Sequence, residues 1–140
     1  VVDAYRKHNV ILSSNVVTFV ALHLISQEFS DMDLISLMNL SGKIFTVEGN
    51  IFKQNVDKLV HIILSKAAEQ EVTISDESWN STDDLIREGI AKLGIYHNPS
   101  ILSVNERMQI VCTDLKLLLF YHNRLANYGF EELLGWKVIN

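Results

Sequence analysis

Residues able to do chemistry gather where a leucine-rich segment ends, at Tyr121, His122, Asn123, Arg124 and Asn127. Histidine is the residue type that most often serves as a general base, and here it stands among hydroxyl and amide groups. On a helix Asn123 and Asn127 lie about one turn apart, so the pattern places polar amides on a flank otherwise meant for burial. Buried amides need hydrogen-bond partners, and the cluster is therefore expected to fix a structure or to line a site.

His122 is nevertheless interpreted as a packed residue and not as a catalytic base. A histidine on a half-buried helix is more often held by one hydrogen bond, and a base also needs a substrate placed within reach. Arg6, Lys7 and His8 form a small basic cluster that could contact phosphate, but three charges near a terminus usually form a solvated face. The sequence therefore identifies no catalytic residue.

Metal and nucleotide sites are not predicted either. Metal ligation needs cysteine and histidine residues at clustered spacing. No histidine lies within one helical turn of the single cysteine, and the histidines are scattered along the chain, at His8, His23, His61, His97 and His122. Glycine-rich phosphate loops and the Gly-x-Ser-x-Gly turn of hydrolases are also missing from the sequence.

The composition predicts one globular domain. The chain has 140 residues, of which 48% are hydrophobic, and this is enough for a compact core. Cys112 lies among apolar neighbours and is expected to be a buried, inert thiol. The net charge is −5, without a long block of one sign, so nucleic acid is not an expected partner. The longest apolar stretch, Val10 to Ile25, is shorter than the about 20 residues of a membrane span.

Hydrophobic periodicity predicts a mainly α-helical fold with one small β-hairpin, and a mixed α+β fold is the second choice. Helices are expected over residues 16–25, 31–40, 56–64, 84–94 and 105–128. Short apolar segments predict strands at 72–74 and 101–104, and these two strands are expected to pair as the hairpin. Residues 1–140 are expected to form a single helical domain.

Three stretches share a pattern with one enzyme family. They are His8 to Ser14 before the first helix, Asp33 to Leu37 in the second, and Tyr121 to Asn127 at the end of the last. Together they resemble the region that follows the catalytic domain in the glycerol-phosphate and dihydroxyacetone-phosphate acyltransferases. The resemblance implies a C-terminal, post-catalytic domain and a fragment of a longer chain. It also implies that Tyr121, Asn123 and Asn127 make hydrogen bonds that fix the last helix.

The two branches of this family are each similar to part of the chain. Asn127 is similar to the dihydroxyacetone-phosphate branch, since the glycerol-phosphate branch usually has histidine there, and the pair Gly42 and Gly49 is similar to the same branch. The segment from Asp84 to Gly94 is instead similar to the glycerol-phosphate branch, and His122 replaces the usual Arg or Ser of either. The resemblance leans to dihydroxyacetone-phosphate acyltransferase.

The family's catalytic motif does not occur in this chain. Such enzymes use a His-x-x-x-x-Asp pair, in which the carboxylate orients the imidazole that deprotonates the acceptor hydroxyl. The residues five positions after the five histidines are Ser13, Glu28, Lys66, Leu102 and Asn127. The family's Phe-Pro-Glu-Gly-Thr-Arg block is also missing, because the only proline is Pro99. This segment alone is expected to be inactive in acyl transfer.

The resemblance implies a non-catalytic role in an acyl-CoA-dependent enzyme that acylates dihydroxyacetone phosphate in ether-lipid synthesis. Acyl-CoA is then a co-substrate of the full-length enzyme, and no cofactor is expected. The expected partners are the chain's own upstream catalytic domain and, through the full-length protein, the peroxisomal membrane. One alternative is the same region of a glycerol-phosphate acyltransferase at the mitochondrial outer membrane. The alternative from another class is an independent helical protein-interaction module.

Overall fold

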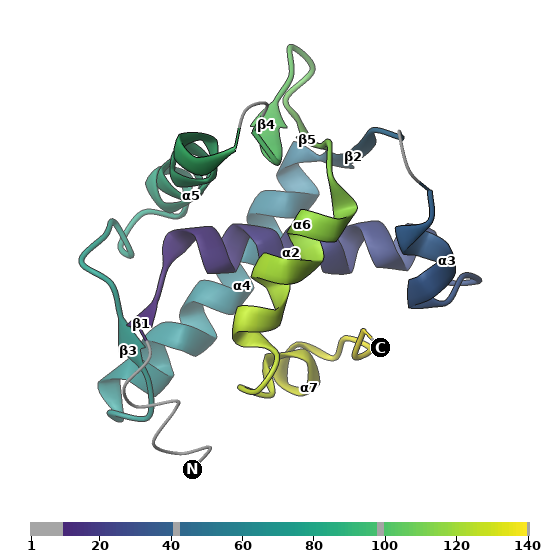
Figure 1. Ribbon diagram of the computed structural model, residues 1–140. Coiled ribbons are helices and arrows are strands. Elements are labelled where there is room, and N and C mark those ends of the chain that lie inside the picture. Colours follow the sequence, from purple (N-terminus) through teal and green to yellow (C-terminus); the bar gives the residue numbers. More distant parts are fainter. Residues whose placement is uncertain (1–9, 41–42, 98–99, 140) are drawn as a thin grey trace.

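The computed structural model describes residues 10–40, 43–97 and 100–139, and it confirms a mainly α-helical fold with a few short strands (Figure 1). In chain order its elements are β1 (Val10–Ile11), α2 (Ser13–Glu28), α3 (Leu34–Met38), β2 (Phe45–Glu48), α4 (Gly49–Ala68), β3 (Thr73–Ile74), α5 (Thr82–Tyr96), β4 (Leu102–Val104), β5 (Gln109–Cys112), α6 (Leu115–His122), the 3-10 turn η1 (Asn123–Leu125) and α7 (Phe130–Leu134). The basic cluster Arg6 to His8, and the residues Asn9, Gly42 and Pro99, lie outside the described residues.

Helix α2 forms the centre of the domain. Every residue from Ser13 to Ile25 is buried, because α2 is apolar on all sides and α4, α5 and α6 pack around it (Figure 1). The side chain of Asn15 caps its start by accepting a hydrogen bond from the N–H of Leu12 at 2.9 Å. The hydroxyl of Thr18 donates to the carbonyl of Ser14 at 2.8 Å, so this buried polar group is also satisfied.

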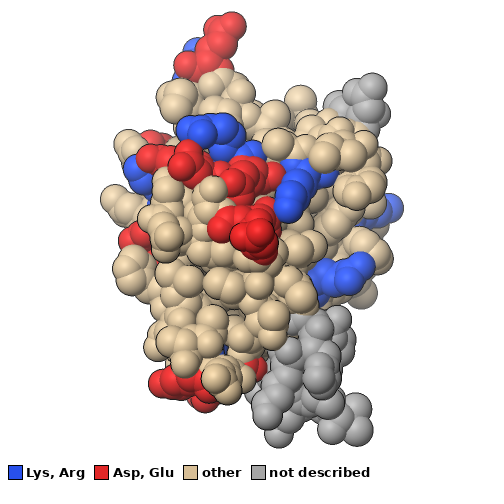
Figure 2. All heavy atoms as spheres, turned by 90° about the vertical axis from the view of Figure 1, so that its left-hand side faces the viewer, with Lys and Arg blue, Asp and Glu red and all other residues tan. Residues whose placement is uncertain are grey.

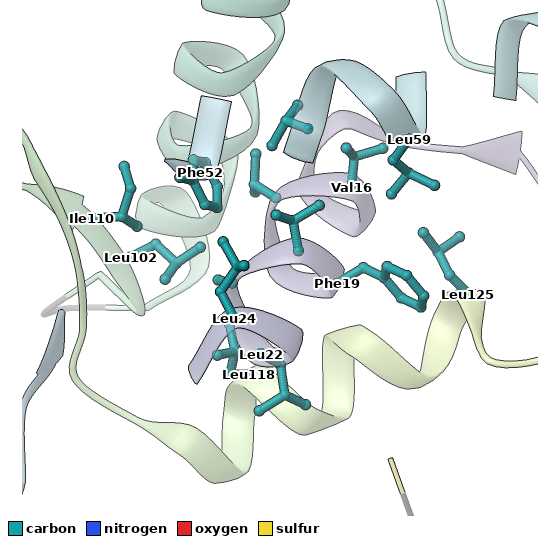
Figure 3. Close-up of a cluster of buried hydrophobic side chains, with 14 of the residues drawn as sticks. Val16, Phe19, Leu22, Leu24, Phe52, Leu59, Leu102, Ile110, Leu118 and Leu125 are labelled. Carbon is teal, nitrogen blue, oxygen red and sulfur yellow. The ribbon is translucent and has the colours of Figure 1, made fainter. Parts of the chain in front are cut away.

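The surrounding helices contribute one apolar face each to a common core. In α4 the buried side chains recur at helical spacing, from Phe52 and Val56 to Leu59 and Ile63. Figure 3 shows side chains of α2, α4 and α6 meeting those of the small sheet in one cluster, among them Val16, Phe19, Leu22, Phe52, Leu59, Leu102, Ile110 and Leu118. Sequence periodicity predicted α4 and α5 because their core-facing positions follow the helical repeat, whereas α2 was predicted from its broad apolar pattern.

The strands form two small sheets, and the predicted hairpin between residues 72–74 and 101–104 is wrong. Strand β3 pairs in parallel with β1, with Ile74 opposite Ile11. Strand β4 instead pairs antiparallel with β5, which also pairs with β2, giving the order β2-β5-β4. Both 72–74 and 101–104 do contain strands, so the error lies in the partners, which depend on contacts between distant residues.

The single long helix predicted over residues 105–128 is also wrong. Asn105 begins a tight turn, because its side-chain oxygen accepts hydrogen bonds from the N–H groups of Arg107 and Gln109, both at 2.9 Å. The chain then forms β5, and α6 begins only after Asp114, whose carboxylate accepts from the N–H of Leu117 at 3.1 Å. The apolar residues of this segment fit the spacing of a strand as well as that of a helix. The pattern alone therefore could not separate one long helix from a strand followed by a helix.

The carboxylate of Glu77 joins three segments at one end of α2. It accepts hydrogen bonds from the N–H of Ser13 at 2.8 Å and from the hydroxyls of Ser13 and Ser75, and its ion pair with Lys92 of α5 measures 2.7 Å. Its side chain is only 4% exposed. Burial alone would raise the pKa of Glu77, but the hydrogen bonds from Lys92, Ser13 and Ser75 outweigh burial and lower this pKa to about 2.

Candidate functional site

The segment from Tyr121 to Asn127 lies where α6 ends and η1 begins. His122 is buried and Tyr121 is half-buried, whereas Asn123, Arg124 and Asn127 are exposed. The expectation that the amides lie on a buried flank is therefore wrong. The residues at core-facing spacing are Leu118, His122 and Leu125, so the amides of Asn123 and Asn127 face solvent instead.

Tyr121 and Asn123 make hydrogen bonds to histidines. The Tyr121 hydroxyl lies 2.9 Å from Nε2 of His97, the residue directly after α5. The side-chain oxygen of Asn123 lies 3.2 Å from Nδ1 of His122. An amide oxygen only accepts, so His122 carries its proton on Nδ1 in this arrangement and its Nε2 presents a lone pair.

That lone pair faces a second buried histidine, which the sequence analysis did not connect with His122. Nε2 of His23, on the central helix α2, lies 3.1 Å from Nε2 of His122, and both residues are 2% exposed. The N–H of His23 donates to the lone pair of His122 in this pair. Ninety-nine positions separate the two residues, so spacing could not reveal the contact. The only sequence signal is a histidine interrupting the apolar pattern of the first helix.

Glu131 is the third chemically active group in this region. It lies in the short helix α7 directly after the turn at Gly129, and it is 3% exposed. One donor atom of each of His23, His122 and Glu131 lies within 4.8 Å of the others. The structure thus brings together two imidazoles and a carboxylate from α2, α6 and α7. We call these three residues the His-His-Glu cluster.

Aromatic side chains wall the His-His-Glu cluster. The ring of Phe19 stacks on His122, with centroids 4.9 Å apart and planes 5° apart, and Trp136 lies 4.9 Å from the ring of His23. Phe130 meets Phe19 edge to face. These contacts exclude water from most of the cluster, and they explain the titration of the histidines. Burial lowers the pKa of His23 to about 3, with repulsion from His122 adding to the effect.

His122 has a lowered pKa for the same reason, since burial outweighs the stabilising hydrogen bond to Asn123. Both imidazoles are therefore neutral near pH 7. Neutral imidazoles act as hydrogen-bond partners, as proton acceptors or as metal ligands. The cluster also reaches an open pocket of about 260 Å³, which His23 lines together with Ser26, Gln27, Asp33, Leu37 and Lys137.

Comparison with known proteins does not assign the chain to a family. No protein-family model, no curated protein and no solved structure matches the chain. The acyltransferase resemblance therefore rests on the sequence motifs.

The remaining sequence-predicted residue, Cys112, lies in β5 and faces the core. It is 1% exposed, which confirms the expected burial. Burial raises the pKa of its thiol to about 11, so the reactive thiolate is scarce at neutral pH. Cys112 therefore acts as a small apolar side chain.

Proposed function

We propose that this chain is the non-catalytic C-terminal part of an acyl-CoA-dependent acyltransferase that acylates dihydroxyacetone phosphate in ether-lipid synthesis. The proposed supporting role rests on the hydrogen bonds that the Tyr121 to Asn127 motif makes. Tyr121 bonds His97 at the end of α5, and His122 bonds His23 in α2. The motif thus holds α6 to two other helices, and these contacts support a structural role.

In this proposal the catalytic pair and the acyl-CoA site belong to an upstream catalytic domain, and the present domain packs against it. Several large apolar side chains are exposed and available for such packing, including Ile95 at 72% and Tyr96 at 77% at the end of α5. An independent helical interaction module, the alternative from another class, would use the same side chains. Exposed apolar residues at adjacent positions are the feature that favours a macromolecular partner.

The charges of the surface suit a protein partner better than nucleic acid. Figure 2 shows acidic and basic side chains interspersed on one face of the molecule. Two ion pairs of α5 illustrate the mixing, Arg87 with Asp84 at 2.8 Å and Lys53 with Asp83 at 3.0 Å. Nucleic-acid binding instead relies on a surface where positively charged side chains predominate.

Membrane association is proposed for the full-length enzyme, at the peroxisomal membrane, or at the mitochondrial outer membrane if the acceptor is glycerol 3-phosphate. Within residues 10–40, 43–97 and 100–139, no helix is long and apolar enough to cross a bilayer.

The supporting role predicts complementation in trans. The upstream segment of the same transcript, expressed alone, is expected to have little acyltransferase activity. Adding this chain should raise that activity at least about tenfold. The tenfold gain corresponds to about 1.4 kcal/mol of stabilisation of the active arrangement. The measurement is acyl-CoA-dependent acylation of dihydroxyacetone phosphate.

The variant Ile95→Asp/Tyr96→Asp, which changes only exposed side chains of α5, tests whether this surface makes the contact. An upstream segment that is fully active by itself would contradict the supporting role.

A further inference from the structure

We propose that the His-His-Glu cluster binds a divalent transition-metal ion, with zinc as the ion best suited to it. The proposal is independent of acyl transfer. It rests on the convergence of His23, His122 and Glu131 from three helices, with donor atoms within 4.8 Å of one another. Two histidines and one carboxylate form a ligand set that zinc accepts in proteins.

The separation of the two imidazole nitrogens fits a shared ion. Zinc binds histidine nitrogen at about 2.0–2.1 Å, so two nitrogens on one tetrahedral ion lie about 3.3 Å apart. The observed distance between the two Nε2 atoms is 3.1 Å, and a small outward movement would admit the ion. The Nε2 proton of His23 then moves through solvent to its Nδ1, which leaves both imidazoles neutral.

The surroundings of His122 are those of a metal ligand. Metal-binding histidines usually donate their second ring N–H to an oxygen, which fixes the tautomer and the ring orientation. The Asn123 side-chain oxygen, 3.2 Å from Nδ1 of His122, supplies this partner. The ring of Phe19 stacks on one face of the His122 imidazole and restricts its orientation. The lone pair of Nε2 is thereby directed at the other members of the cluster.

The environment supplies charge and access as well. Imidazole is a neutral ligand when it binds a metal, so the carboxylate of Glu131 brings the negative charge that a buried divalent ion requires. The pocket of about 260 Å³ that His23 lines provides a path from solvent as far as this residue. An ion held there would join α2, α6 and α7, and zinc is expected to raise the melting temperature of the protein.

The test is a titration of the purified, chelator-treated 140-residue chain with Zn²⁺, and with Co²⁺ as a spectroscopic probe. We expect one ion per chain, and visible absorption of Co²⁺ typical of a tetrahedral nitrogen and oxygen site. Glu131→Gln and His23→Gln should each weaken binding at least about 100-fold, since loss of an outer partner alone costs about 10–100-fold. His61→Ala is the matched control, because the side chain of His61 is 75% exposed on α4.

Asn123→Ala keeps the test decisive if the buried variants fail to fold. Asn123 is exposed, so its removal should leave the fold intact while weakening zinc binding about 10-fold or more. Asn50→Ala, at another exposed asparagine, is its control and should bind as the wild type does. Absence of saturable binding by the folded wild-type chain would overturn the proposal, and so would equal loss of affinity in His61→Ala. The two histidines would then form a hydrogen-bonded pair only.

Discussion

Gly89→Ala is expected to lower the free energy of unfolding by about 1–3 kcal/mol, although alanine is the better helix former. Gly89 lies in α5 where this helix crosses α2. A Cβ atom at this position would lie 2.8 Å from the carbonyl oxygen of Ser13 and 3.0 Å from Cγ1 of Val17. The first neighbour is backbone of the buried central helix, so it cannot move aside without disturbing the core.

Gly94→Ala is the matched control on the same helix. Gly94 is exposed, and among the described residues a Cβ atom there would meet only the side chain of Ser100, at 3.7 Å or more. Replacing a helical glycine at such a position should stabilise the protein by about 0.5–1 kcal/mol. Chemical denaturation of both variants measures the difference. Equal effects of the two substitutions would show that α5 does not approach α2 this closely, and Gly89→Leu should prevent folding if it does.

Glu77→Gln is expected to destabilise the protein by about 3 kcal/mol at neutral pH and to have less effect in acid. The pKa of Glu77 is lowered from 4.5 to about 2 in the folded state, and a difference of this size corresponds to about 3 kcal/mol. Because the folded-state pKa lies below the unfolded one, this stabilisation is complete above pH 4.5. It is lost as the pH falls through the window from about 4.5 to about 2.

The measurement is urea denaturation of wild type and variant at several pH values between about 7 and 2.5. The difference in unfolding free energy should be constant down to about pH 5 and should then shrink. Glu71→Gln is the control, since Glu71 pairs with Lys66 on the surface at 3.2 Å and its side chain is 51% exposed. Its removal should cost at most about 1 kcal/mol. A difference for Glu77→Gln that does not change with pH would contradict the role assigned to its charge.

The sequence predicted those parts of the fold that depend on local pattern. The apolar positions of α4 recur at helical spacing, and Ser81 caps α5 by accepting from the N–H of Asp84, so both helices could be located in advance. Strand β5 could not, because Val111, Cys112 and Leu115 fit a continuous helix as well as a strand followed by one. The turn at Asn105 decides between them, and its side-chain hydrogen bonds are visible only in three dimensions.

The candidate site was harder to foresee than the fold. His122 was singled out in the sequence, but its partners lie in α2 and α7, far away along the chain. The amides of Asn123 and Asn127 drew attention by their spacing, although both are exposed. Spacing along one helix reports only which residues share a face. It gives no information on which face is buried when apolar residues occur on both sides of the segment.

The most direct test of the proposed function compares the acyl-CoA-dependent acylation of dihydroxyacetone phosphate and of glycerol 3-phosphate by the product of the whole transcript and by this chain alone. The proposal predicts that the whole product acylates dihydroxyacetone phosphate preferentially and that the chain alone is inactive with either acceptor. Preference for glycerol 3-phosphate would assign the chain to the other branch of acyltransferases. Absence of activity in the whole product would contradict the proposal and would favour a helical interaction module.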